Sequence, residues 1–149
     1  MSDSHSALMA RDYRFFEAAR KAALESDFPT RVGSIAVYGG RVIASAFSSQ
    51  KTNPLQSKYN IYRKFQTDCA DCLPKVHAEI SLITKLRRVQ NIDLKRVKVY
   101  VYRVCKSRDK GLARPCKACL IALRDAGIRT VYYTTDFGYA HEWIDYKEA

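Results

Sequence analysis

The hydrophobic positions at the start of the chain predict one helix followed by a hairpin. Over residues 8–26, apolar side chains return at the three- and four-residue spacing of an amphipathic helix. The next two apolar runs, residues 33–38 and 41–47, are strand-sized and are separated by Gly39-Gly40. Since a two-residue Gly-Gly loop between such runs favours a tight turn, the sequence predicts a β-hairpin here.

The second half of the chain alternates helical and strand patterns. Helical periodicity covers residues 76–89 and 115–126, whereas β-rich runs cover residues 96–103 and 130–135. The strand–helix–strand order favours a parallel pair of strands joined by a right-handed crossover. Residues 139–148 predict a short final helix.

The helix predicted over residues 115–126 has clear end signals and two cysteines in its first turn. Pro115 suits the first helical position, and Gly127 suits the left-handed residue that ends a helix. Cys116 and Cys119 are three residues apart and therefore share a helix face, so that one ion can bridge both sulfurs. The positive end of the helix dipole also favours thiolates at this position.

Length and composition indicate an ordinary globular α/β protein. The 149 residues suit one domain over 1–149, with a core over 12–135 and a helical C-terminal tail over 136–149. The longest apolar runs are strand-sized, so we expect no membrane span. Since residues 1–10 lack the order of a secretory signal, we expect a cytoplasmic location.

The formal net charge of +11 favours an anionic partner, either a nucleotide or a nucleic acid, without choosing between them. Residues 58–64 combine cations with tyrosines, a mixture that suits single-stranded nucleic acid. Residues 106–114 carry four cations and lead into the cysteine helix, where they could meet a substrate phosphate. The simpler interpretation of both segments is a solvated charged surface.

Two short motifs together point to a catalytic zinc site. His77 lies at the start of the helix over residues 76–89 and can add one nitrogen ligand to the sulfurs of Cys116 and Cys119. Three protein ligands leave one tetrahedral position open, which is typical of catalytic rather than structural zinc. Zinc held in this way lowers the pKa of water to about 7 and so provides hydroxide at neutral pH. Glu79, two residues beyond His77, is the candidate general acid and base.

At His77-Ala78-Glu79 and Pro115-Cys116-Lys117-Ala118-Cys119 the sequence resembles the cytidine/deoxycytidylate deaminase superfamily, whose zinc signature is His-x-Glu … Pro-Cys-x-x-Cys. The resemblance covers residues 12–135, and residues 115–134 are similar to the deoxycytidylate and tRNA-adenosine deaminase branches. It implies a three-layer α/β/α sandwich around a five-stranded mixed sheet with a parallel end. It also implies a Zn²⁺ cofactor, a nucleoside or nucleotide substrate and a homo-oligomer.

The resemblance departs from the family at one substrate position. Family members commonly carry an asparagine after the second strand to hold the sugar, whereas this chain has Ser48 there and Asn53 further along. We take Ser48, Asn53 and Ala78 as candidate substrate contacts. For Ser48 and Asn53 the alternative is turn capping, because both residue types often stabilise turns.

A second cysteine pair, Cys69 and Cys72, lies upstream of His77. Some deoxycytidylate deaminases resemble this chain in having a second, structural zinc, to which Cys105 or His5 could contribute here. Such a site needs four ligands. Two thiols in a loop are the favoured interpretation, since no clear third and fourth ligand is visible.

Three functions remain open. The leading one is hydrolytic deamination of a cytosine nucleoside or nucleotide to its uracil form. The second is editing of cytosine or adenine in single-stranded DNA or RNA, which the net charge favours. The third is a non-catalytic, zinc-stabilised binding domain, against which Glu79 argues because a structural zinc site does not need an acid beside the metal.

Overall fold

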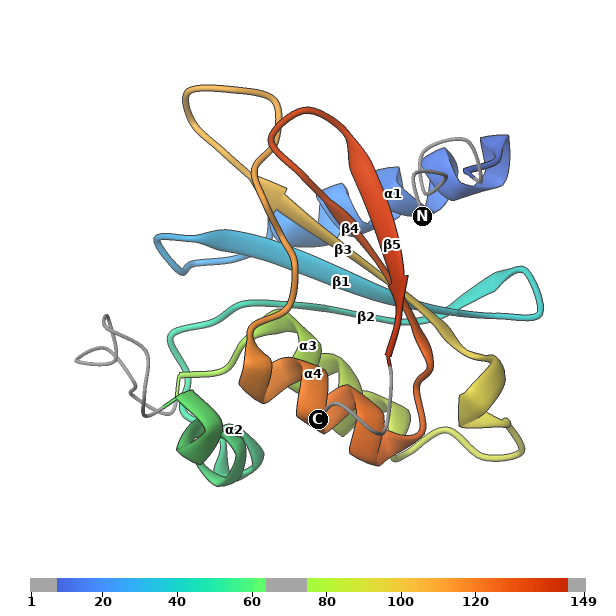
Figure 1. Cartoon of the computed structure of the whole chain (residues 1–149). Coiled ribbons are helices and arrows are strands. Elements are labelled where there is room, and N and C mark those ends of the chain that lie inside the picture. Colours follow the sequence, from blue (N-terminus) through green and yellow to red (C-terminus); the bar gives the residue numbers. More distant parts are fainter. Residues whose placement is uncertain (1–7, 64–74, 145–149) are drawn as a thin grey trace.

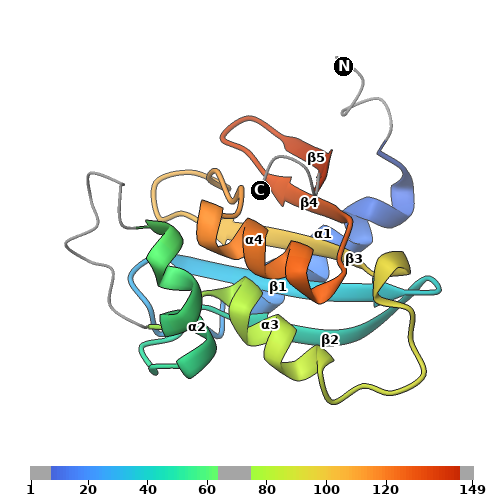
Figure 2. The ribbon, with the colours of Figure 1, turned by 60° about the horizontal axis from the view of Figure 1, so that its bottom comes forward.

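The computed structural model describes residues 8–63 and 75–144, which build a mixed five-stranded sheet between two helical layers (Figure 1). Helix α1 (Ala10–Ala23) covers one face, and α3 (Ala78–Leu86) and α4 (Lys117–Ala126) cover the other (Figure 2). This is the three-layer α/β/α arrangement that the sequence predicts. The strands are β1 (Arg31–Tyr38), β2 (Arg41–Phe47), β3 (Lys98–Val104), β4 (Thr130–Thr134) and β5 (Tyr139–Trp143).

The strands lie in the order β2-β1-β3-β4-β5. Strand β1 pairs antiparallel with both β2 and β3, whereas β3 and β4 are parallel and are connected through α4. The predicted parallel pair is therefore confirmed. The predicted hairpin is confirmed as well, because Gly39 and Gly40 have φ angles of 59° and 78° and form its turn. Glycine adopts such positive φ angles without steric cost.

The final helix predicted over residues 139–148 is wrong where the structure describes it. Residues Tyr139–Trp143 form β5, which pairs antiparallel with β4 and supplies the fifth strand. The chain reverses through a turn in which Thr135 N–H donates to the carbonyl of Gly138 at 2.8 Å. Pairing satisfies the backbone groups that β4 would otherwise leave open, and this outweighs a weak helical pattern. The sheet therefore ends antiparallel rather than parallel, and residues 145–149 lie outside the described part.

The helices are shorter than their hydrophobic patterns predict. Helix α3 begins at Ala78 because Val76 belongs to an extended segment, where its N–H donates to the carbonyl of Lys51 at 3.0 Å. Cys116 is the N-cap of α4, so Pro115 precedes the cap and does not occupy the first helical position. Gly127, with a φ of 104°, ends α4 in the left-handed conformation as predicted.

Strand β3 is buried on both faces, which explains its continuous run of large side chains. Val99 and Val101 belong to the hydrophobic cluster between the sheet and helices α3 and α4. Tyr100 and Tyr102 pack against α1 on the other face. Successive side chains of a strand point to opposite faces. The same alternation therefore assigns every β3 residue to the α1 side or to the α3/α4 side.

The long connection predicted without a clear period contains the short helix α2 (Pro54–Tyr59) and the 3₁₀ turn η1 (Asn60–Arg63). Its start is fixed by Asn53, whose side-chain oxygen accepts from the N–H groups of Leu55 at 2.8 Å and Gln56 at 3.3 Å. Its end is tied to α4, because the Tyr59 hydroxyl donates to Asp125 at 2.8 Å. Among the described residues, no helix is both long and apolar enough to cross a membrane.

Gly33 sets how closely α1 approaches the sheet, and its replacement tests this packing. A Cβ atom added at Gly33 would overlap backbone atoms of Ala19 and Ala23, which cannot rotate away. We therefore expect Gly33→Ala to lower the free energy of unfolding by about 1–3 kcal/mol or more, the range for an overfilled core. Urea unfolding measures the change.

Gly39→Ala is the matched control, since its Cβ would meet no atom within 4 Å and only the positive φ opposes it. We expect a cost of about 1–2 kcal/mol there. A Gly33→Ala protein that is as stable as the original chain would show that α1 can move away from β1.

Candidate metal centre and active-site cavity

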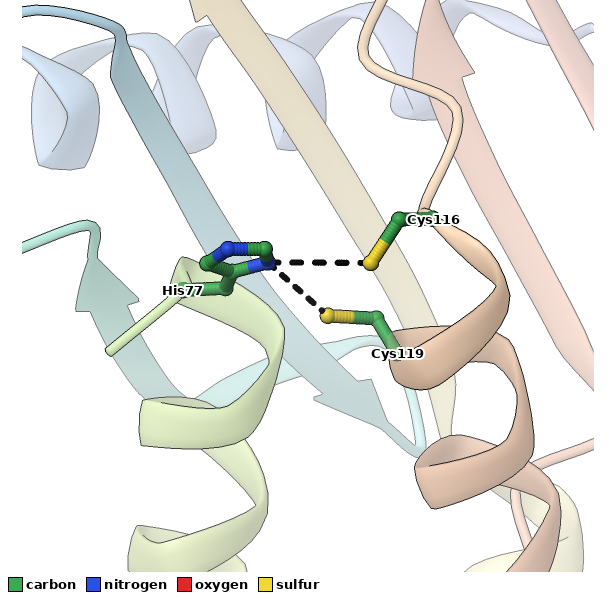
Figure 3. A group of neighbouring side chains, drawn as sticks. All are labelled: His77, Cys116 and Cys119. Carbon is green, nitrogen blue, oxygen red and sulfur yellow. Dashed lines mark hydrogen bonds between the residues drawn. The ribbon is translucent and has the colours of Figure 1, made fainter. Parts of the chain in front are cut away.

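Three potential metal ligands converge where α3 and α4 begin. Nδ1 of His77 lies 3.4 Å from Sγ of Cys119 and 3.7 Å from Sγ of Cys116 (Figure 3). His77 is the N-cap of α3 and Cys116 is the N-cap of α4, so both side chains leave the backbone at helix starts. All three donor atoms lie within 4.8 Å of one another.

The spacing and the chemistry of this group fit zinc. Ligands at about 2.0 Å for nitrogen and 2.3 Å for sulfur, arranged tetrahedrally, would lie about 3.5 Å apart for a nitrogen–sulfur pair. The two observed nitrogen–sulfur distances, 3.4 and 3.7 Å, fall on either side of that value. One imidazole and two thiolates are also ligands that zinc prefers. Within the described ranges the group has three members, as the sequence predicts for an open coordination position.

Cys116 is predisposed to be a thiolate. A hydrogen bond from Cys119 is the largest influence that lowers its pKa, to about 4, and His77 acts in the same direction against the effect of burial. The sulfur also lies at the positive end of the α4 dipole, which favours negative charge. Metal binding requires deprotonated cysteine, so this environment favours the ligand form.

The turn that carries His77 is held by two buried polar side chains that the sequence analysis does not identify. Gln56 is fully buried, and its side-chain oxygen accepts from the backbone N–H of His77 at 2.9 Å. From strand β1 of the sheet, the Ser34 hydroxyl donates to the carbonyl of Ala78 at 2.9 Å. These bonds attach the first turn of α3 to α2 and to β1. No periodicity identifies Gln56, because its role depends on a contact with a residue 21 positions away.

Glu79 lies beside the metal group in an environment that favours proton exchange. Its side chain is buried, with 5% of its surface exposed. Burial raises the pKa of Glu79 to about 7, whereas the nearby His77 opposes the rise. A divalent cation at the three ligands would also lower this pKa, because positive charge favours the carboxylate. Within the site, Glu79 is thus the carboxyl group placed to hold or release a proton.

A cavity of about 560 Å³ opens onto the metal group. Its wall includes His77, Ala78, Glu79 and Cys116, so two of the three predicted ligands and the predicted acid face one common space. The remaining lining residues come mainly from the α1–β1 connection, the end of β2 and the segment before α4. They are Phe28, Pro29, Thr30, Val32, Ser48, Gln50, Lys75, Arg103, Leu112, Ala113 and Arg114.

The basic residues of this cavity differ in how far their charge is compensated. Arg114 forms two hydrogen bonds with Glu142, at 2.6 and 3.0 Å, and this carboxylate raises its pKa. Among the described residues, Lys75 makes one side-chain contact, at 3.4 Å to the carbonyl of Gln50. Arg103 makes no side-chain hydrogen bond or ion pair among residues 8–63 and 75–144. Arg103, which sequence reasoning missed, is therefore the cation most available to an anionic ligand.

The candidate substrate contacts have different surroundings. Ala78 and Ser48 line the cavity, but Ser48 uses its hydroxyl within the protein, donating to Thr30 at 2.9 Å and accepting from Val32 at 3.1 Å. Asn53 is outside the cavity lining and caps α2 instead. The turn-capping alternative therefore describes the observed bonds of Asn53.

The charged segments of the sequence are largely occupied by contacts within the protein. In the segment over residues 106–114, Arg108 pairs with Asp136 at 3.1 Å and Lys110 pairs with Asp109 at 3.0 Å. In the segment over residues 58–64, Tyr59 is buried, whereas Tyr62 is exposed. Of the four cations in the first segment, Arg114 is the one that lines the cavity.

The predicted second metal site falls outside the described residues, because Cys69, Cys72 and His5 all lie there. Cys105 is described and half-buried, and it is separate from the group around His77. Its sulfur lies against Gly111, where a Cβ atom would come within 2.6 Å of it. A structural zinc at Cys69 and Cys72 stays a prediction.

Comparison with known proteins identifies the class to which this fold and site belong. The family model described as "Cytidine and deoxycytidylate deaminase zinc-binding region" matches residues 9–135. The chain belongs to this deaminase family. The match includes all five named residues of the predicted signature and ends before β5. No curated protein matches the chain in sequence.

Solved structures of the family share the fold at low sequence identity. The dCMP deaminase from the cyanophage S-TIM5 is 18% identical, with a TM-score of 0.59 over 86% of each chain. Cytidine deaminase from Burkholderia pseudomallei is 14% identical, with a TM-score of 0.59 over 92% of this chain and 94% of that one. Since both enzymes fit equally well, the fold does not choose between their substrates.

Loss of one sulfur tests the metal centre. We expect the purified chain to contain about one zinc per molecule, and we expect Cys119→Ser to lose it. The loss of affinity should exceed the roughly 10–100-fold that changes around a metal's ligands cost, because a ligand itself is removed. Elemental analysis of dialysed protein measures the metal content.

Cys105→Ser is the matched control, since it changes a half-buried thiol outside the group. It should keep the zinc. Equal metal content in the Cys119→Ser and Cys105→Ser proteins would contradict the assignment of the ligands.

Proposed function

We propose that the chain is a zinc-dependent hydrolytic deaminase that converts the cytosine base of a free nucleoside or nucleotide to uracil and releases ammonia. One observation carries this proposal: His77, Cys116 and Glu79 line the same cavity. Cys119 lies beside them and completes the group of three potential metal ligands. A structural metal site would not need a buried carboxyl group on a cavity wall. This arrangement therefore supports catalysis over a non-catalytic zinc-stabilised domain.

The chain's residues divide the chemistry between them. His77, Cys116 and Cys119 hold the metal, and zinc when bound supplies a water molecule activated for attack on the amino-bearing carbon. Glu79 would take one proton from the attacking water and deliver it to the ring nitrogen. It would then take the second proton from the hydroxyl newly attached to the carbon and deliver it to the departing amine. One carbon–oxygen bond forms, one carbon–nitrogen bond breaks, and the amino group leaves as ammonia. The buried wall around Glu79 limits competing exchange of its proton with solvent.

The cations of the cavity support a phosphorylated substrate. Arg103 and Lys75 line the wall, and Arg103 has no counter-charge in the described part of the chain. A guanidinium group binds phosphate through two parallel hydrogen bonds, which gives both affinity and orientation. The similar cyanophage enzyme was solved in complex with dCMP and dUMP. A pyrimidine nucleoside monophosphate such as dCMP is therefore the substrate class that we propose.

Editing of single-stranded nucleic acid is the second candidate, and the net charge of +11 is the observation that favours it. The structure removes part of its other support, because Tyr59 is buried and its hydroxyl is bound to Asp125. That ring is not available to stack on a base. A cytoplasmic location and a homo-oligomer stay predictions alongside both candidates.

The substrate and the role of Glu79 can be tested together. We expect ammonia release from dCMP or cytidine, and no release from single-stranded oligonucleotides. Glu79→Gln should keep its zinc and lower kcat by about 10²–10⁴-fold, because an amide cannot transfer the proton. Ammonia release and metal content are measured on the same samples.

Different failures of this experiment have different meanings. Retained turnover in the Glu79→Gln protein would remove the acid/base assignment. Activity on oligonucleotides with none on mononucleotides would replace the proposed substrate with the editing alternative. Metal without activity on any substrate of the panel would favour the non-catalytic domain.

Arg103→Gln tests the phosphate contact. Losing a charged hydrogen bond costs about 1.5–3 kcal/mol, so we expect kcat/KM for dCMP to fall about 10–150-fold. The value for cytidine, which lacks the phosphate, should change little. Steady-state kinetics with both substrates measure this ratio.

Arg108→Gln is the control, because it removes an exposed arginine outside the cavity lining. It should leave both values unchanged. An equal loss for dCMP and cytidine in the Arg103→Gln protein would contradict a contact with phosphate.

A further inference from the structure

A second cavity, of about 510 Å³, lies on the α1 side of the sheet. It is bounded by the β1–β2 turn, by the short 3₁₀ turn η3 (Leu94–Arg96) and by the first turns of α1. The β1–β2 turn and η3 lie at the opposite end of the sheet from the N-termini of α3 and α4 (Figures 1 and 2). The two cavities share no lining residue, so one small ligand cannot fill both.

Three cations from three elements converge on this cavity. Arg11 comes from α1, Arg96 from η3 and Lys98 from the start of β3. Lys98 lies on the α1 side because residues two apart in a strand point to the same face, and Tyr100 packs against α1. Arg11 is one helical turn from Phe15, which also lines the cavity.

The lining of this cavity carries positive charge and no carboxylate. None of the three cations makes a side-chain hydrogen bond or an ion pair with any residue that the structure describes. Two carboxylates nearby offset part of this charge, but each is hydrogen-bonded to neutral donors and not to the three cations. Asp12 accepts from the Met9 N–H and the Tyr100 hydroxyl, and Asp93 accepts from the Lys95 N–H.

The shape and the floor of the cavity suit a bound anion. Phe15 and Tyr100 form a buried floor, so an anion in contact with it would be partly removed from water. Charge interactions strengthen where the effective dielectric constant falls. The exposed Gly39 and Gly40 form part of the rim and have no side chain that would narrow the entrance. Converging like charges disfavour the folded state, and an anion that neutralises them would stabilise it.

We propose that this cavity is a second ligand site, distinct from the deaminase cavity, which binds phosphate groups. Two guanidinium groups and an ammonium group in one cavity match the charge of a phosphate ester or anhydride. The phosphates can belong to a free nucleotide or to a nucleic-acid strand. The site supplies charge and orientation, and it carries no group that would react with the ligand.

Inorganic pyrophosphate and a ten-residue oligothymidylate are the probes, titrated into the full chain at constant ionic strength by calorimetry. We expect pyrophosphate to bind, and we expect the double substitution R96Q/K98Q to weaken binding at least about tenfold. R87Q/R88Q, which removes two exposed cations outside both cavities, should change it less than about twofold. Metal content is checked after each titration to exclude chelation.

Two further variants separate this site from the deaminase cavity. Glu79→Gln should bind pyrophosphate like the unaltered chain although its turnover is lost, and R96Q/K98Q should keep its deaminase activity within about twofold. If R96Q/K98Q does not fold, the exposed Arg96→Gln alone should weaken binding several-fold. Oligothymidylate binding that depends on Arg96 and Lys98 would assign the phosphates to a strand, and pyrophosphate binding alone would assign them to a free ligand.

The proposal is overturned by either of two results. In the first, R87Q/R88Q weakens pyrophosphate binding as much as R96Q/K98Q, so that only overall charge matters. In the second, Arg103→Gln removes the binding and R96Q/K98Q does not, so that the anion occupies the deaminase cavity. The proposal is also overturned if neither pyrophosphate nor oligothymidylate binds at millimolar concentration.

Discussion

The site depends on two helices that begin side by side on one face of the sheet. The parallel pairing of β3 and β4 requires a crossover, and α4 is that crossover, so its first residue lies at the end of the sheet reached by β3. Helix α3 begins at the same end, where Gln56 and Ser34 hold its first turn. The backbone topology thus brings an imidazole and two sulfurs together although they are about 40 positions apart in sequence.

The same arrangement separates the tasks of the metal ligands from those of the carboxyl group. A residue at a helix start can lean away from the helix axis, which allows His77 at the cap and Glu79 two residues later to face one cavity. Burial raises the pKa of Glu79 to about 7, which favours exchange of a proton at this carboxyl. In the proposed mechanism, metal binding and proton transfer would therefore fall to neighbouring residues that have different surroundings.

The sequence was sufficient for those parts of the fold that depend on local patterns. The Gly39-Gly40 turn, the end of α4 at Gly127 and the cysteine pair at the start of α4 all follow from short-range rules, and the structure agrees with them. Strand β5 was missed because its identity comes from pairing with β4, which outweighs a weak local preference.

Gln56 and Arg103 were missed for a related reason. Gln56 acts through a hydrogen bond to the backbone of a distant residue. Arg103 becomes significant because no acid among residues 8–63 and 75–144 pairs with it. The roles of both residues depend on neighbours that are distant in sequence, and hydrophobic periodicity contains no information on such contacts. Cys116, by contrast, was identifiable because its partner Cys119 is three residues away on the same helix.

Strand β5, at the edge of the sheet, also contacts the segment that leads into the metal group. It lies beyond residues 9–135, which the family model matches. Its Glu142 nevertheless accepts two hydrogen bonds from Arg114, two residues before Cys116. The Tyr133 hydroxyl, from the neighbouring strand β4, donates to the same carboxylate at 2.7 Å and holds it in place. Without β5, Arg114 would lose its carboxylate partner close to Cys116, and β4 would become an unpaired edge that could pair with a strand of another molecule.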